Sequence, residues 1–476
     1  MIILSDGSME ASTETVPLSY DDVADRIDAL GPFEASPHVA VAVSGGRDSM
    51  ALCMLLHQWA LQCGGRVSAI TVDHQLRPES AEEAKQVGHW LEKAGIDHHV
   101  LVLSGLKPTS GVQAAARMAR YNLMEDWCRN AGVLHLFLGH HRDDQAETVL
   151  FRLQHNSGID GLAGMSSIRE QSHIRLLRPL LDIPRERITV YLQSHKQSWI
   201  EDPSNDNPKY ARTQLRAQLR TQLRSEPKDV TEGELTAEHL IKLSGRCARA
   251  RMALEQETAR TMAQCCSITP FGFAHLDDEK FRAVPVEISL RVLLQTIQCV
   301  GGRAYRPKQV QLERLHDLIL KGRMRRSRTL GGCQVSCQDG ALLVVREYRN
   351  LPASKELTVG ESVVWDNRFR VELNDRVFQV CDRIWLEAVG RKDQEVIKAV
   401  SSTEIGQGLP SSVTQTLPAL WDRQGLAFVP HVNYVRDDLR AIPQNARKVT
   451  FQPHQGLGGS GFAGFMLQEQ PDILSL

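Results

Sequence analysis

The chain has 476 residues, enough for two or three domains, and its 42% hydrophobic and 24% charged content is ordinary for a soluble protein. No segment approaches the ~18 uninterrupted apolar residues of a membrane-spanning helix, and the acidic first 36 residues are unlike a signal or transit peptide. We therefore expect a cytoplasmic protein with no membrane partner. The ten cysteines include no Cys-x-x-Cys pair, which argues against a disulfide framework.

The first predicted strand ends in the most informative motif. Residues 38–43 are apolar and mostly β-branched, and leucines at helical spacing follow as far as residue 63. The turn between them consists of Ser44, Gly45, Gly46, Arg47, Asp48 and Ser49. Two glycines and the free N–H groups of a helix start predict a phosphate site. The lysine of a Walker A loop is missing. Because Asp48 is acidic, a phosphate beside it implies Mg²⁺.

Strands and helices then alternate. Apolar runs predict strands at 67–72, 100–103 and 134–138, and helical patterns occupy 79–94, 112–130 and 143–154. This order predicts a parallel sheet wrapped by helices. Ligands of such sheets bind beyond the carboxyl ends of the strands, where this sequence has Ser44, Asp73 with His74, and Gly139 with His140. We expect these residues to form one site.

An acidic helix start follows the last of these strands. His140, Asp143, Asp144 and Glu147 are spaced so that they project from one helix face. Oxygen ligands favour Mg²⁺, with Asp48 and Asp143 as its ligands, over a zinc site. The remaining alternative is an acidic capped helix start without a ligand.

Basic residues are concentrated in two segments, although the net charge is only −1. Between residues 209 and 224, Arg212, Arg216, Arg220 and Arg224 recur at every fourth position beside a leucine stripe. Residues 321–328 hold five more basic residues. Arginine stripes suit phosphate backbones and predict nucleic-acid binding, whereas a solvated helix face is the alternative.

Seven segments in the same order resemble the bacterial tRNA(Ile)-lysidine synthases, a family of PP-loop ATP pyrophosphatases. They lie at 44–49 (Ser-Gly-Gly-Arg-Asp-Ser), 72–77, 113–121, 139–148 (beginning Gly-His-His), 161–165, 178–181 and 201–205. The resemblance covers residues 37 to about 220, and weaker similarity continues at 329–332 and 417–431. It implies an adenine nucleotide alpha hydrolase-like α/β fold.

The resemblance also implies a reaction. ATP would adenylate the wobble cytidine of a tRNA(Ile) with a CAU anticodon, and free L-lysine would displace AMP. The product, lysidine, would change codon recognition from AUG to AUA. The ATP-binding residues would be 44–49, Asp73, His74, Gly139 and His140, and the catalytic residues Asp48, Arg117, Asp143 and Asp144. Arg117 would stabilise phosphate charge, and either aspartate would hold or deprotonate the lysine amine.

A PP-loop tRNA thiolase is the alternative function. Such enzymes generally need paired cysteines or an iron-sulfur cluster, so the missing Cys-x-x-Cys argues against it. A tRNA-binding module with an inactive nucleotide site is the non-enzymatic alternative, against which the intact Ser44, Asp48 and Asp143 speak. His155, Asn156 and Thr213 depart from the family pattern and put local tRNA or loop contacts in question.

The predicted organisation has six parts. They are an N-terminal extension (1–36), the adenylating domain (37–208), a basic helix and linker (209–238), a mostly α tRNA-binding domain (239–350), a small β-rich domain (351–440) and a flexible tail (441–476). A homodimer is compatible with the resemblance, but the sequence does not determine the oligomeric state.

Overall fold

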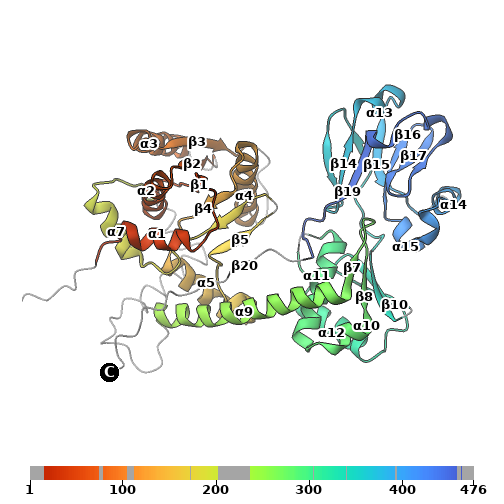
Figure 1. The fold of residues 1–476 in the computed structure, drawn as a ribbon, viewed down its shortest axis with the longest axis horizontal. Helices are drawn as coiled ribbons and strands as arrows, with labels where there is room; N and C mark the ends of the chain where they lie inside the picture. Colours follow the sequence, from red (N-terminus) through yellow and green to blue (C-terminus); the bar gives the residue numbers. More distant parts are fainter. Residues whose placement is uncertain are drawn as a thin grey trace, which may run out of the picture. The chain divides into compact units, whose positions relative to one another are not determined.

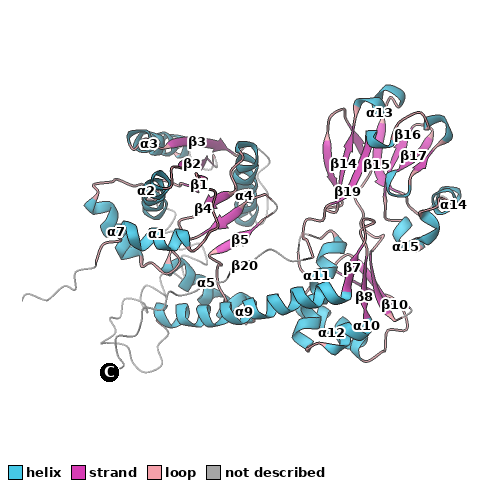
Figure 2. Cartoon of the chain, viewed as in Figure 1, coloured by secondary structure: helices cyan, strands magenta, loops and turns pink. Residues whose placement is uncertain are grey.

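The computed structural model describes residues 16–73, 75, 79–103, 112–171, 173–201, 236–303, 305–338, 340–391, 394–457 and 462–463. The chain divides into two units, Met1–Met252 with Gly461–Leu476, and Ala253–Ser460 (Figure 1). Figure 2 shows that helices surround the sheet of the first unit and that strands dominate the end of the second. No described helix is long and apolar enough to cross a membrane.

The first unit alternates strands and helices as predicted. Its elements are α1 (Tyr20–Asp28), β1 (His38–Ala42), α2 (Arg47–Gln62), β2 (Arg66–Asp73), α3 (Ser80–Lys93), β3 (Asp97–Val102), α4 (Val112–Ala131), β4 (His135–Phe137), α5 (Arg142–Gln154), α6 (Ile159–Leu162), β5 (Ile168–Glu170), β6 (Arg175–Leu177), α7 (Arg185–Ser194) and β20 (Phe462–Ala463). The helix α9 (Ala237–Cys265) follows and contains the division between the units. The predicted parallel-sheet α/β fold is thereby confirmed.

These strands form one sheet in the order β20-β5-β6-β4-β1-β2-β3. The strands from β6 to β3 are parallel, with Val41 of β1 opposite Ala69 on one side and Phe137 on the other. The chain leaves β1 for β2 and β3, then returns to the opposite side of β1 to form β4. The strand order therefore reverses between β1 and β4, which is where open α/β sheets bind ligands.

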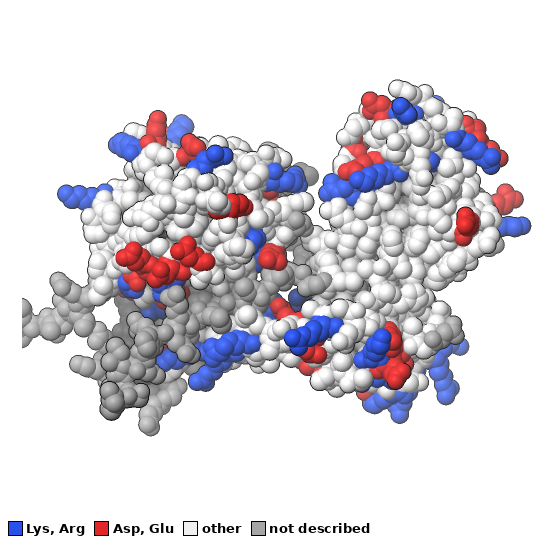
Figure 3. Space-filling view, in the orientation of Figure 1, with Lys and Arg blue, Asp and Glu red and all other residues white. Residues whose placement is uncertain are grey.

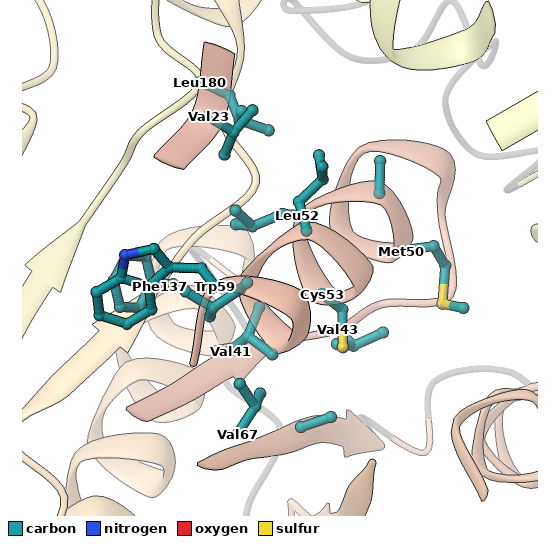
Figure 4. Packing of buried hydrophobic residues seen from close by; sticks show 14 of the residues in the cluster. Val23, Val41, Val43, Met50, Leu52, Cys53, Trp59, Val67, Phe137 and Leu180 are labelled. Carbon is teal, nitrogen blue, oxygen red and sulfur yellow. The ribbon is translucent and has the colours of Figure 1, made fainter. Parts of the chain in front are cut away.

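A buried apolar cluster packs the end of β1 against helix α2 (Figure 4). Val41 and Val43 lie beneath Leu52 and Trp59 of α2, and all four are buried. Helix α1 belongs to the same cluster, because Val23 and Ile27 are buried and the Trp59 Nε1–H donates to Asp28 at 2.8 Å. The predicted extension 1–36 therefore includes, from residue 18 on, part of the core of the first unit.

The second unit carries three sheets. Its elements are β7 (Cys266–Ile268), β8 (Ala274–Asp277), α10 (Asp278–Ala283), α11 (Val286–Gly301), α12 (Gln309–Leu320), β9 (Arg328–Leu330), β10 (Cys333–Gln338), β11 (Ala341–Arg346), β12 (Lys355–Leu357), β13 (Ser362–Trp365), β14 (Phe369–Leu373), α13 (Asp375–Val380), β15 (Ile384–Ala388), α14 (Gln394–Ser401), α15 (Ser411–Thr414), β16 (Pro418–Asp422), β17 (Gly425–Val429), β18 (Tyr434–Val435) and β19 (Arg447–Phe451). The sheet orders are β7-β8-β11-β10-β9, β12-β15-β16-β17-β18 and β13-β14-β19.

The second unit differs from its predicted parts in two places. A five-stranded sheet accompanies the helices between residues 266 and 346, in a segment predicted to be mostly α. Residues 447–451 lie in the predicted tail, yet they form β19 opposite β14. This strand is ordered by its pairing partner, because Val449 and Phe451 pack against the apolar cluster that contains Phe369.

A buried charge cluster joins two of these sheets. The guanidinium groups of Arg346 and Arg368 both bind the carboxylate of Asp366, at 2.9 and 2.7 Å, and all three side chains are almost fully buried. Arg368 also donates to the carbonyl oxygens of Gly272 and Thr416, each at 3.3 Å. The Asp366 carboxylate therefore balances the charges of Arg346 and Arg368. These contacts link the sheet that contains β11 to the sheet that contains β14.

Candidate active site

The loop between β1 and α2 is held in shape by hydrogen bonds within it and by one from outside, in which the Ile200 N–H donates to the Gly45 carbonyl at 2.8 Å. The Ser44 N–H donates to Ser49 Oγ at 3.1 Å, and Ser49 Oγ–H donates to the Gly46 carbonyl at 2.9 Å. Gly45 has φ = +81°, and a Cβ there would lie 2.8 Å from Ile200. No side chain caps the start of α2, so its first N–H groups are available to an anion.

The end of β4 contacts this loop directly. A Cβ on Gly139 would lie 3.0 Å from the carbonyl oxygen of Asp48 and 3.1 Å from Cα of Ser49. Any larger residue would push the end of β4 away from the first turn of α2. The predicted convergence of Ser44 and Gly139 is therefore observed, at the point where the strand order reverses.

A cavity of about 200 Å³ opens between the two strand ends. Its lining is Ala42, Val43, Ser44, Gly46, Asp48, Ser49, Ile70, Val72, Arg120, Tyr121, Met124, Leu138, Gly139 and His140. Strand and helix side chains such as Ile70 and Met124 make one part of it apolar, whereas the loop makes the other part polar. An apolar wall beside a polar anion-binding loop suits a nucleotide, whose base and phosphates differ in the same way.

Asp48 lies between two basic side chains. Its Oδ2 is 3.7 Å from His141 Nε2, and its Oδ1 is 3.9 Å from Arg185 Nε. Neither Oδ1 nor Arg185 Nε has a hydrogen-bond partner in the described part of the chain, although both atoms are buried. Burial raises the pKa of the Asp48 carboxyl above its ordinary value, while His141 and Arg185 act in the opposite direction.

Asp48 Oδ1, which has no hydrogen-bond partner among the described residues, could contact a bound cation. The described residues contain no group of three or more side chains that could hold a metal ion together. Mg²⁺ typically uses one or two carboxylates and completes its coordination with substrate phosphates and water. Asp48 therefore fits Mg²⁺ that arrives with a nucleotide, and does not fit a permanently bound metal.

His141 links Asp48 to the acidic helix start. The ring nitrogen Nδ1 of His141 accepts the backbone N–H of Asp143 at 3.2 Å. The backbone N–H of His141 donates to Asp144 Oδ2 at 3.2 Å, and the two hydrogen bonds together cap α5. Because Nδ1 accepts a hydrogen bond, the neutral ring carries its proton on Nε2, which faces Asp48 and, at 3.4 Å, Asp144. The sequence prediction omitted His141 from the site residues, because histidine is not among the usual helix-capping residues.

Basic groups surround His140. Burial is the main cause that holds the pKa of His140 far below its ordinary value, and the positive charges of Arg178, Arg117 and Arg120 act in the same direction. Arg117 is exposed on α4, where its guanidinium lies over the Tyr121 ring at 5.2 Å. This end of the cavity therefore combines a neutral imidazole with several cations.

We expect His140 to remain neutral from pH 8 to pH 5. The unfolded chain takes up a proton at this residue below pH ~6.5, whereas the folded chain does not. The free energy of unfolding should therefore fall as the pH drops below ~6.5, and less so in His140→Gln. The histidine NMR resonance that is lost in this variant should not titrate in the wild-type protein. A midpoint near pH 6.5 for that resonance would contradict this expectation.

Two predicted ATP-binding residues make other contacts. Arg47 donates to Thr189 Oγ1 at 3.3 Å and to Glu201 at 3.0 Å, and it is absent from the cavity lining. Asp73 Oδ1 accepts the Gln75 N–H at 2.9 Å and the Ser80 hydroxyl at 2.6 Å, so it orders the turn after β2. His74, Arg212, Arg216, Arg220 and Arg224 lie outside the described residues.

Known proteins share sequence with most of this chain. The PP-loop domain profile matches residues 20–223. A tRNA(Ile)-lysidine synthase of Wolbachia sp. subsp. Brugia malayi (strain TRS) is 35% identical over 335 residues, which are 70% of this chain and 76% of the relative. One of Orientia tsutsugamushi (strain Boryong) is 31% identical over 87% of this chain and 93% of the relative.

Solved structures show a more distant likeness. The U34-tRNA thiolase NcsA of Methanococcus maripaludis, with its 4Fe-4S cluster, is 17% identical and has a TM-score of 0.40. The match covers 48% of this chain and 78% of the thiolase.

Proposed function

The chain belongs to the tRNA(Ile)-lysidine synthase family, and we propose from this membership and the site geometry how its residues divide the reaction. As a ligase, it uses ATP to adenylate the wobble cytidine of tRNA(Ile) with a CAU anticodon. The amine of L-lysine then displaces AMP and forms lysidine. The reaction would take place in the cytoplasm, where free lysine and tRNA are present.

One observation carries this proposal: the serine- and glycine-rich loop meets Gly139 and His140 where the strand order reverses. The free N–H groups of α2 would bind ATP phosphate there. Cytosine's ring carbonyl is a poor electrophile, so transfer of AMP to its oxygen creates a leaving group that an amine can displace. Arg117 would stabilise the charge on the α-phosphate.

Asp48 would hold Mg²⁺, with Asp143 as its proposed second ligand. When bound, the ion would neutralise phosphate charge. Because His141 connects Asp48 with Asp144, the nucleotide end and the acidic helix start would form one continuous site. The carboxylate of Asp143 or that of Asp144 would attract the lysine ammonium group and accept its proton before attack.

Sulfur transfer fits this site less well than lysine transfer. The structure describes all ten cysteines, and none of them lines the cavity. Six of the ten are buried in the cores, among them Cys53 of α2. The site therefore offers no thiol that could carry sulfur to an adenylated tRNA.

An intermediate on the RNA tests this proposal. We expect ATP labelled at the α-phosphate to leave label on tRNA(Ile) when lysine is omitted, because the cytidine is activated first. Adding unlabelled lysine should then release the label as AMP. Transfer of label to lysine without tRNA would contradict the proposal, because it would mean that the amino acid is adenylated instead.

The loop between α12 and β9 is a candidate surface for the tRNA backbone. Arg323, Arg325, Arg326 and Arg328 are exposed, and none has an acidic partner within the described part of the chain. Figure 3 shows basic side chains gathered at the lower edge of the second unit. Exposed arginines without acidic partners suit phosphate groups.

Replacing these four arginines with glutamine should weaken tRNA binding by about tenfold or more at low salt, and should lower the slope of log K against log salt by about one per lost phosphate contact. Filter binding over a salt series measures both effects. The matched control is Arg440→Gln, because Arg440 is exposed in the same unit but pairs with Asp437 at 2.6 Å. Equal slopes for the two variants would exclude this loop from the tRNA interface.

A further inference from the structure

The phosphate loop contains one cation, and that cation is engaged elsewhere. A Walker A loop uses its lysine to bind the β- and γ-phosphates, but this loop has Arg47 instead. The Arg47 guanidinium binds Glu201 and Thr189 and lies over the Trp199 ring at 5.6 Å. It is therefore held at the outer side of the loop by three contacts, so the diphosphate of ATP needs a cation from another element.

Arg185 is a candidate for that cation: like Arg47 it does not line the cavity, but it lies next to Asp48, which does. It is the first residue of α7, more than a hundred positions after the loop, and its Nε lies 3.9 Å from Asp48 Oδ1. That distance is too long for a hydrogen bond, and the buried Nε has no partner among the described residues. The side chain as a whole is 31% exposed, which leaves its other nitrogens within reach of a ligand.

The backbone of Arg185 is fixed independently of its side chain. Its carbonyl oxygen accepts the Thr189 hydroxyl at 3.0 Å, and Ile188 and Leu192 bury α7 against the core of the first unit. A rigid helix thus presents the guanidinium beside the loop. The Arg185 guanidinium is partly exposed, permanently charged and has an N–H without a hydrogen-bond partner among the described residues. Such a group next to an anion-binding loop suits a phosphate ligand.

We propose that Arg185 binds the β- and γ-phosphates of ATP and stabilises the diphosphate as it leaves. The inference rests on the proposed function only in that ATP is the substrate. During adenylation the cytidine carbonyl oxygen forms a bond to the α-phosphorus. The bond from that phosphorus to the bridging oxygen breaks, and its electron pair stays on the diphosphate. A guanidinium beside that oxygen offsets the negative charge that develops there.

Binding of ATP and AMP separates this role from a structural one. We expect Arg185→Met to weaken binding of Mg-ATP by about tenfold or more, because charge-assisted hydrogen bonds to phosphate are lost. AMP lacks both phosphates, so its affinity should change less than twofold. Pyrophosphate should compete with ATP in the wild-type protein and not in the variant. Arg185→Lys keeps the charge and should lose less ATP affinity than Arg185→Met.

The matched control is Arg187→Met on the same helix. Arg187 pairs with Asp22 at 2.6 Å and does not contact Asp48, so its loss should leave the ratio of ATP to AMP affinity unchanged. The proposal would be overturned if Arg185→Met left the ratio of ATP to AMP affinity unchanged, either because neither affinity fell or because both fell equally. If Arg185→Met does not fold, the ratio in Arg185→Gln, which also removes the charge, decides. A wild-type protein that binds no ATP would instead contradict the proposed function.

Discussion

Replacing Asp48 with asparagine is expected to slow lysine incorporation into tRNA(Ile) by about 10²-fold to 10³-fold, the range typical for loss of one group that stabilises transition-state charge. The carboxylate lies in the loop itself, and its buried Oδ1 has no hydrogen-bond partner among the described residues. Asparagine has nearly the same shape, so the loop should keep its conformation. It carries no charge, however, and cannot replace a carboxylate as a ligand of Mg²⁺.

Single-turnover formation of AMP and lysidine measures this effect, and circular dichroism checks the fold. The control is Asp97→Asn, because Asp97 is exposed at the first residue of β3, away from the strand ends that form the site. We expect the control to retain wild-type rates. If Asp48→Asn were equally active, the buried carboxylate would have no part in adenylation.

Replacing Asp366 with alanine should lower the free energy of unfolding by about 3–5 kcal/mol, because it leaves buried charges without a partner. Arg346 and Arg368 both depend on this one carboxylate, and their side chains are only 2% and 0% exposed. The loss should appear in urea unfolding followed by tryptophan fluorescence, since Trp365 is the residue before Asp366.

A surface ion pair of the same unit provides the control. Asp382 pairs with Arg423 at 3.1 Å, and both side chains are more than half exposed. Asp382→Ala should therefore cost less than about 1 kcal/mol. A similar loss of stability in the two variants would show that the Arg346, Asp366 and Arg368 cluster does not hold the sheets of the second unit together.

The phosphate loop and the strand ends were predictable because they depend on local sequence. The apolar strand before Ser44, the two glycines and the helical leucines after Asp48 fix the geometry of the loop by themselves. The place of Gly139 could also be predicted, because the carboxyl ends of parallel strands meet at one edge of a sheet. Its contact with Asp48 then explains why a glycine is needed there.

Contacts between distant segments were not predictable. Arg185 and Asp48 are brought together by the packing of α7 against α2, which no spacing in the sequence records. The contacts of Arg47 with Thr189 and Glu201 could not be predicted either, because its place in the motif indicated only ATP. The strands β7, β8, β9 and β10 lie in a segment that was predicted to be mostly α. The strand β19 was missed because its partner β14 lies more than seventy residues earlier in the chain.

Labelled lysine tests the central claim most directly. The purified protein would be incubated with this lysine, ATP, Mg²⁺ and either tRNA(Ile) or tRNA(Met), each with a CAU anticodon. We predict that label enters tRNA(Ile) alone, that AMP forms in equal amount, and that Asp48→Asn slows both by about 10²-fold to 10³-fold. If ATP is converted to AMP in the presence of tRNA(Ile) while no lysine enters the RNA, the proposed ligation is contradicted.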